Sequence, residues 1–135
     1  MTAVHRVVEQ TFTAGTDHAD PFGTLELDLV VTDPAGTERR VPAFWAGGRT
    51  WRARYSSALP GEHAWRSACS DQDDAGLHDQ LGVFVIDVAE GETNPLYRHG
   101  APTLAEDRRH FCYGDGAPFL WLADTWWMGL VDRLP

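Results

Sequence analysis

The strongest candidate for chemistry is a carboxylate near the carboxy terminus, Asp124, which is followed by the tryptophans Trp126 and Trp127. Carboxylates accept hydrogen bonds from hydroxyl groups, and the apolar faces of sugar rings stack on aromatic side chains. We therefore predict that these three residues bind a sugar. An Asp-Thr pair is also typical of a helix N-cap, and Asp124 can serve both purposes.

The residues before Asp124 predict how it is positioned. Phe119 to Ala123 is apolar at every position, as expected for a strand that is covered on both faces in a parallel sheet or barrel. Side chains at the carboxyl ends of barrel strands line the active site. We expect two strands, His110–Tyr113 and Pro118–Ala123, around the turn Gly114–Gly116, in which Asp115 serves the backbone geometry.

The sequence offers no complete set of catalytic residues. Glycosidases need two carboxyl groups about 5 to 10 Å apart, and neither Asp115 nor Asp132 is placed to converge on Asp124. We assign no catalytic residue and expect no hydrolysis by this chain alone. We also expect no metal and no cofactor, because the six histidines are scattered and the acidic stretch Asp71–Gly76 lacks the chelating Glu of a calcium loop. That stretch is predicted to be a solvated turn.

Composition limits the classes of partner. The chain has 135 residues, 43% of them hydrophobic, and a formal net charge of −9, which disfavours nucleic acid and anionic membranes. No apolar run is long enough to span a membrane and the amino terminus has no apolar signal core, so we expect a cytoplasmic location. Two cysteines, Cys69 and Cys112, are predicted to be free thiols.

The first 90 residues are dominated by strand signals. Leu25, Leu27, Leu29 and Val31 alternate with polar residues, and Val30 is the exception. A further strand is expected from Arg39 to Trp45, with Pro42 at a sheet edge or bulge. About seven short strands with Gly and Pro turns at roughly ten-residue spacing predict an antiparallel, immunoglobulin-like β-sandwich.

Three tryptophans of this region could be core residues or a sugar platform. Trp51 lies on an alternating strand with Ala53 and Tyr55, so we expect it and Trp65 to be core residues. Arg52 and Arg54 face the other way, toward acidic residues of a neighbouring strand. Trp45, beside Gly47-Gly48, is predicted to lie near the surface and to bind sugar.

Several short blocks carry a family resemblance when their order and spacing are taken together. The blocks are Asp20-Pro21-Phe22, Phe44-Trp45-Ala46-Gly47-Gly48, Trp51–Tyr55, Pro60–Trp65, His99-Gly100, Phe111–Phe119 and Leu122–Trp127. They resemble the N-terminal β-sandwich and first barrel strand of the apiosidase-like glycoside hydrolases (domain of unknown function 4038). The resemblance implies that Asp124 helps to hold sugar. Such enzymes continue for several hundred residues, with their acid and nucleophile on later strands that are not present here.

We therefore expect an all-β chain in two parts. Residues 1–92 form the immunoglobulin-like accessory sandwich, and residues 93–135 form a linker and the start of a truncated (β/α)8 barrel. The expected function is that of an accessory domain in a glycoside hydrolase that acts on plant-type polysaccharide. A free-standing carbohydrate-binding module and a protein-interaction scaffold are the alternatives. Carbohydrate is the expected partner, and the apolar residues of 111–130 predict self-association.

Overall fold

The computed structural model describes residues 2–88, 90–123 and 125. The chain divides into two compact units, residues 1–98 and 99–135, and each is described by itself. The predicted domain boundary between residues 92 and 93 lies a few residues before this division and stays a prediction.

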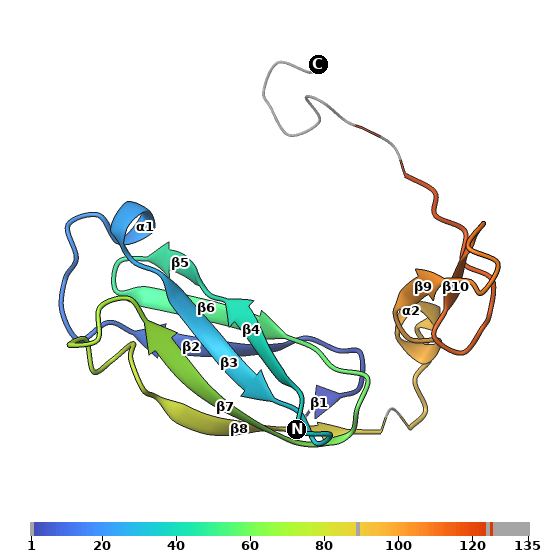
Figure 1. Ribbon diagram of the computed structural model, residues 1–135, viewed down its shortest axis with the longest axis horizontal. Coiled ribbons are helices and arrows are strands. Elements are labelled where there is room, and N and C mark those ends of the chain that lie inside the picture. The colour runs from blue at the N-terminus through green and yellow to red at the C-terminus, as the bar shows by residue number, and fades with distance from the viewer. Residues whose placement is uncertain (1, 89, 124, 126–135) are drawn as a thin grey trace. The chain divides into compact units, whose positions relative to one another are not determined.

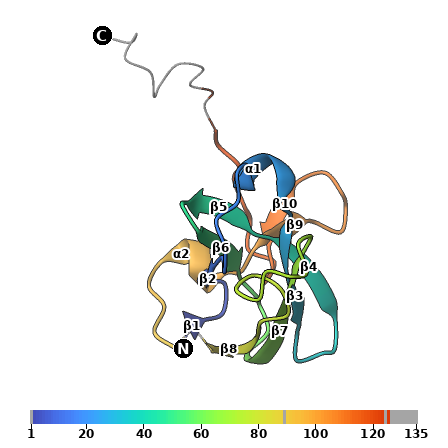
Figure 2. The same ribbon diagram turned by 90° about the vertical axis from the view of Figure 1, so that its left-hand side faces the viewer.

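The first unit is a β-sandwich of two facing sheets (Figures 1 and 2). One sheet has five strands in the order β1-β8-β7-β3-β4, and the other has three in the order β2-β6-β5. All neighbours are antiparallel except β1 and β8. The strands are β1 (Thr2–Ala3), β2 (Val8–Thr13), β3 (Leu27–Thr32), β4 (Glu38–Pro42), β5 (Phe44–Gly47), β6 (Thr50–Tyr55), β7 (Gly61–Cys69) and β8 (Leu81–Asp87).

The strand order is that of an immunoglobulin fold. In that fold the second, fifth and fourth strands share one sheet, and the third, sixth and seventh share the other, with an extra strand beside the third in variable-type domains. Strands β2, β6 and β5 occupy the first set of places here, while β3, β7 and β8 occupy the second, with β4 as the extra strand. The predicted immunoglobulin-like sandwich is confirmed.

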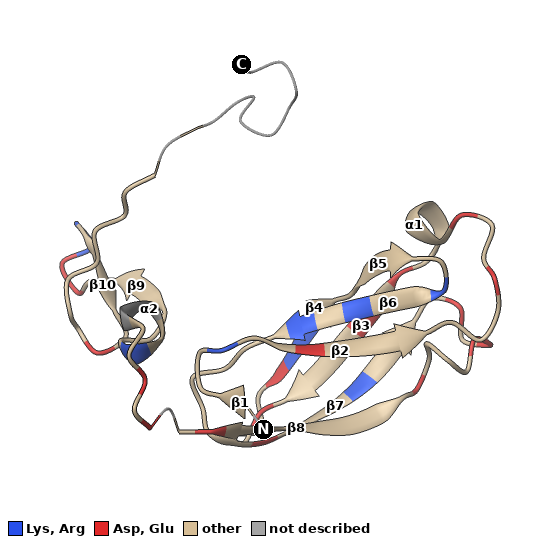
Figure 3. Cartoon of the chain, turned by 180° about the vertical axis from the view of Figure 1, so that it is seen from behind, with Lys and Arg blue, Asp and Glu red and all other residues tan. Residues whose placement is uncertain are grey.

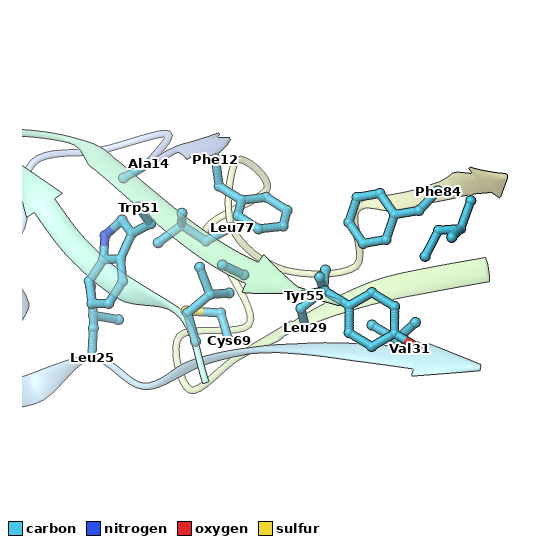
Figure 4. Close-up of a cluster of buried hydrophobic side chains, with 13 residues drawn as sticks. Phe12, Ala14, Leu25, Leu29, Val31, Trp51, Tyr55, Cys69, Leu77 and Phe84 are labelled. Carbon is cyan, nitrogen blue, oxygen red and sulfur yellow. The ribbon is translucent and has the colours of Figure 1, made fainter. Parts of the chain in front are cut away.

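The core lies between the sheets and follows the predicted alternation (Figure 4). Leu27, Leu29 and Val31 of β3 are 3%, 0% and 1% exposed. Val30, the exception in the pattern, is also buried, although its neighbours along the strand place it on the outer face. The buried cluster comprises Phe12, Ala14, Leu25, Leu27, Leu29, Val31, Trp51, Ala53, Tyr55, Cys69, Leu77, Phe84 and Ile86.

The single strand expected from Arg39 to Trp45 is wrong in one respect. Residues Glu38–Pro42 form β4 at the edge of the five-stranded sheet, and Phe44–Gly47 form β5 in the other sheet. The chain crosses between the sheets at Ala43, whose amide donates to the Leu27 carbonyl at 2.8 Å. Pro42 lies on β4, the edge strand of the five-stranded sheet, so its expected edge position is confirmed. Proline fits there because it has no amide hydrogen to donate to a further strand.

The second unit contains a small antiparallel pair, β9 (Pro102–Leu104) and β10 (Phe111–Tyr113). The expected strand His110–Tyr113 is thus formed. The expected strand Pro118–Ala123 is not: Cys112 and Pro118 make one isolated bridge, and the Phe119 amide donates to the Phe111 carbonyl at 3.1 Å. Residues 120–123 pair with no strand among the described residues of this unit, so the barrel strand stays a prediction.

Two single-turn helices complete the description. The first, α1 (Pro21–Thr24), follows its N-cap Asp20, whose side chain accepts from the Gly23 amide at 3.0 Å. The second, α2 (Pro95–Arg98), ends the first unit. Among the described residues, no helix is long and apolar enough to cross a membrane.

Candidate functional site

Trp45 lies on β5, at the edge of the three-stranded sheet, and is 38% exposed. Its indole Nε1 donates to the Gly48 carbonyl at 2.8 Å. This contact is possible because the chain turns sharply through Gly47 and Gly48, whose φ angles of +104° and +54° favour glycine. The expected surface position of Trp45 is confirmed, and its role in sugar binding stays a prediction.

Phe44, which the sequence analysis did not select, lies on the outer face of the same sheet. It is 40% exposed and pairs in register with Arg52 of β6. The guanidinium of Arg54 lies 5.0 Å from the centroid of the Phe44 ring, within cation–π range. The position of Phe44 on the outer face is set by the register of β5 against β6. The residues next to Phe44 in the sequence do not indicate this register.

Strands β2 and β6 of this sheet carry acidic and basic residues (Figure 3). Glu9 of β2 accepts from Arg52 at 3.1 Å and from Arg54 at 2.9 Å. This confirms that the two arginines face acidic residues of a neighbouring strand. Exposed ion pairs contribute little to stability. The outer face of the three-stranded sheet therefore presents the Phe44 ring beside two guanidinium groups and a carboxylate. All of these groups can contact a hydroxylated ligand.

The two tryptophans that were predicted to be core residues, Trp51 and Trp65, differ in how deeply they are buried. Trp51 is 3% exposed, as predicted. Trp65 is half-buried, but its ring lies 5.8 Å from those of Phe12 and Phe84, so it also faces the core. Its indole lies against Gly82 so closely that a Cβ at that position would come within 2.3 Å of the ring. Neither ring belongs to an exposed sugar platform.

The predicted sugar-binding residues Asp124, Trp126 and Trp127 lie outside the described residues. The segment that leads to them carries a set of contacting aromatic rings. The centroid of Trp121 lies 5.3 Å from that of Phe111 and 6.0 Å from that of Phe119, and Phe119 lies 5.0 Å from Tyr113. Trp121 remains 64% exposed despite these contacts.

Asp115 holds the turn that precedes this segment. Its Oδ1 accepts from the Ala117 amide at 3.0 Å, and its Oδ2 lies 2.5 Å from His99 Nδ1. The hydrogen bond from His99, followed by that from Ala117, lowers the pKa of Asp115 below its ordinary value. These contacts agree with the expected structural role.

The solvated turn expected at Asp71–Gly76 is corrected at one residue. Asp74 is 3% exposed because its carboxylate is enclosed by groups from a distant loop. Oδ1 accepts from the Gly15 amide at 2.7 Å and the Gly76 amide at 2.9 Å, and Oδ2 lies 2.9 Å from His18 Nε2. Burial acts to raise the pKa of Asp74, but the hydrogen bonds from Gly15, His18 and Gly76 outweigh it and lower the pKa. The buried carboxylate of Asp74 therefore joins its own loop to the loop that contains Gly15 and His18.

Metal and thiol chemistry find little support in the described part of the chain. No group of three or more His, Cys, Asp and Glu side chains there could hold a metal ion. Cys69 and Cys112 are free thiols, as expected. Cys69 is buried in the sandwich, and this burial raises the pKa of its thiol, which makes it less reactive.

The fold defines the class of protein, an immunoglobulin-like β-sandwich with an exposed aromatic edge on its smaller sheet. The chain belongs to the DUF5060 family, a domain of unknown function whose family profile matches residues 1–70. A search of curated proteins found no match.

A solved structure shares this fold. It is described as a "putative glycoside hydrolase" from Bacteroides vulgatus ATCC 8482, with a TM-score of 0.70 and 21% sequence identity. The similarity covers 87% of this chain and 21% of that one. The chain therefore spans about a fifth of the length of the protein that it matches.

Proposed function

We propose that this chain is the N-terminal accessory β-sandwich of a glycoside hydrolase that acts on plant-type polysaccharide. The observation that carries the proposal is the similarity of 87% of this chain to one fifth of a much longer protein that is described as a "putative glycoside hydrolase". The resemblance of Phe111–Trp127 to the first barrel strand of the apiosidase-like enzymes supports a catalytic barrel as the neighbouring domain. Fold alone does not fix function, so the substrate class rests on that resemblance.

We expect no hydrolysis by this chain, because we assign no catalytic pair of carboxylates in it. Three of the described carboxylates make structural contacts: Glu9 with Arg52 and Arg54, Asp74 with His18, and Asp115 with His99. A glycosidase instead needs two carboxyl groups about 5 to 10 Å apart that face one scissile bond. Asp124 then binds sugar beside catalytic residues that another part of the enzyme supplies.

The test is an incubation of the purified chain with pectic and other plant-wall oligosaccharides, followed by measurement of reducing sugar. We expect no release above the buffer control. Release that is lost in an Asp124→Asn variant and kept in an Asp115→Asn variant would contradict the proposal, because it would place a working active site within these 135 residues.

Carbohydrate binding by the sandwich itself is the second candidate function. Phe44 and Trp45 are both partly exposed on the edge strand β5, and they point to opposite faces of the sheet: Phe44 lies beside the hydrogen-bond donors Arg52 and Arg54, and Trp45 is in register with Trp51. Affinity electrophoresis in gels that contain plant polysaccharide separates the two candidates, since a purely structural sandwich migrates unretarded. Retardation that is lost in Phe44→Ala and Trp45→Ala, but kept in Phe22→Ala on α1, would favour the binding function.

A role as a protein-interaction scaffold, the third candidate function, has one supporting observation. The outer face of β8 carries Leu81, Val83 and Val85, which are 75%, 52% and 40% exposed. The outer face of the three-stranded sheet is by contrast mostly charged and hydroxylated. An apolar stripe of this kind is typical of a surface that another protein domain covers. This agrees with an accessory domain that stabilises a partner domain.

A further inference from the structure

The segment that follows β8 leaves the sandwich without forming a strand, yet one of its charged side chains is joined to the amino-terminal turn. We call residues 90–98 the strap. The side chain of Glu92 in the strap is only 9% exposed. The Oε2 atom of Glu92 accepts from Nε and Nη2 of Arg6, at 3.0 and 2.7 Å. The Oε1 atom of Glu92 accepts from the Asn94 amide at 2.9 Å. The two hydrogen bonds from one guanidinium and the third from the Asn94 amide hold this carboxylate in a single orientation.

Arg6 holds the strap at a second point. Its guanidinium carbon lies 4.6 Å from the centroid of the Tyr97 ring, which is a cation–π contact. Tyr97 belongs to α2, whose turn is closed by hydrogen bonds from the Tyr97 and Arg98 amides to the Asn94 carbonyl at 3.0 and 3.1 Å. One guanidinium thus connects both the beginning and the end of the strap to the amino-terminal turn.

The backbone of Arg6 is itself fixed to the sandwich. The Arg6 amide donates to the Ala3 carbonyl at 3.2 Å, which closes a turn, and the Val4 amide donates to the Asp87 carbonyl of β8 at 2.8 Å. His5, within this turn, has a φ of +65° and donates to the Ser57 carbonyl at 2.8 Å. The left-handed conformation at a non-glycine residue is unfavourable by itself and is maintained by these contacts.

Two open pockets lie between the amino-terminal turn and the strap. An open pocket of about 630 Å³ is lined by Ala3 and Arg6 on one side and by residues of 87–93 on the other. A second, of about 470 Å³, lies between Val4 and His5 of the turn and residues of the strap that include Tyr97. Among the contacts of the described residues, those of Arg6 reach across these hollows to both ends of the strap.

We propose that Arg6, Glu92 and Tyr97 form a clamp that makes the strap a fixed part of the sandwich. The free movement of the chain then begins after Arg98, and not at the end of β8. The clamp would set the point at which the polypeptide leaves the accessory domain. This inference rests on contacts within residues 1–98 alone and holds whether or not the proposed function is correct.

The test uses the full chain with and without Arg6→Ala and measures backbone ¹⁵N order parameters for residues 91–94 and 96–98, since Pro95 has no amide hydrogen. We expect values of about 0.8 in the native protein and below about 0.6 in the variant. Hydrogen exchange at the Tyr97 and Arg98 amides should accelerate by roughly tenfold, while the amides of β3 and β7 keep their native rates. Glu92→Gln should act in the same direction, and Tyr97→Leu less strongly, because it removes only the ring contact.

Arg40→Ala is the matched control. Arg40 donates to Asp28 Oδ2 from Nε and an NH2 nitrogen at 3.0 and 2.7 Å, the same geometry as the Arg6 pair, but within the five-stranded sheet. It should leave the strap unchanged. Order parameters below about 0.6 in the native strap, or equal values in the native protein and Arg6→Ala, would overturn the proposal.

Discussion

The two units use apolar residues in opposite ways. In the sandwich, residues from both sheets close over one another, so that Leu29 and Ala53 are completely buried. In the second unit, Leu120 and Leu122 are 83% and 87% exposed, although this segment is the most continuously apolar in the chain. Apolar content alone therefore does not make a core. It stabilises only where a second layer is present to cover it.

The comparison separates what the sandwich can do by itself from what the second unit requires. Two facing sheets bury enough apolar surface to fold alone, whereas a pair of three-residue strands is marginal in water. The rings of Phe111, Phe119 and Trp121 contact one another but leave much of their surface exposed. This difference agrees with an accessory domain followed by a segment that needs further partners, as the proposed function requires.

The largest expected effect on stability comes from replacing a leucine by alanine in the sandwich, and the same replacement in the second unit serves as the comparison. Leu29→Ala should lower the free energy of unfolding by about 2 to 5 kcal/mol, because it leaves a cavity in the core. Leu122→Ala should change it by less than about 0.5 kcal/mol, because its side chain is already exposed. Urea denaturation of both variants measures the contrast. Equal losses in the two proteins would show that the second unit has a core of its own.

The next effect concerns a buried polar contact that joins the two sheets. The Tyr55 hydroxyl lies 3.0 Å from His63 Nδ1, and His63 Nε2 lies 3.0 Å from the Leu59 carbonyl. Since a carbonyl only accepts, Nε2 donates and Nδ1 accepts from Tyr55. Tyr55→Phe should therefore cost about 1 to 3 kcal/mol by leaving Nδ1 unpaired in the core. The control Tyr113→Phe, in the second unit, should leave the urea midpoint of the sandwich unchanged.

A smaller effect should come from Asp74 and should depend on pH. Asp74→Asn should cost about 1 to 2 kcal/mol at pH 7, because it removes a charge-assisted hydrogen bond to His18. The pKa of Asp74 is lower in the folded state than its ordinary value, so the unfolded chain binds more protons in acid. The stabilisation is complete above the ordinary value of about 3.9 and is lost as pH falls through the folded pKa.

Urea denaturation at pH 7, 5 and 3 measures this dependence. The stability gap between the native protein and Asp74→Asn should narrow toward pH 3. The exposed neighbour Asp73 provides the control, and Asp73→Asn should have little effect at any of these values. A gap at Asp74 that is constant across the range would mean that its charge does not stabilise the fold.

The smallest expected effect is weak self-association through residues 111–130. Sedimentation velocity should show an average mass that rises above 15.0 kDa with concentration. The double variant Leu120→Ser, Leu122→Ser should remain monomeric, while Leu81→Ser on the sandwich should associate as the native protein does. A native chain that stays monomeric at high concentration would contradict this prediction.

Local patterns were sufficient for much of the sandwich. The alternation along β3 and β6 predicted which side chains are buried, because a strand with one covered face has a period of two in any context. Pro42 marked a sheet edge for a similarly local reason, its missing amide hydrogen.

Features that depend on distant partners could not be read in the same way. The crossing at Ala43 depends on which sheet offers the next neighbour, and the exposure of Phe44 depends on the register of β5. Burial of Asp74 needs Gly15 and His18, which lie far away in the sequence. Phe119–Ala123 is apolar at every position, but a pattern cannot supply the second layer that a buried strand requires.

The most direct test of the account is residue-resolved hydrogen exchange on the monomeric full-length chain. If the sandwich is a complete folding unit and the second unit is not, amides of β3, β6 and β7 should exchange only through global unfolding. The amides of residues 120–123, which pair with no strand among the described residues, should exchange at close to unfolded rates. Protection of residues 120–123 equal to that of β3, in a sample shown to be monomeric, would contradict the account.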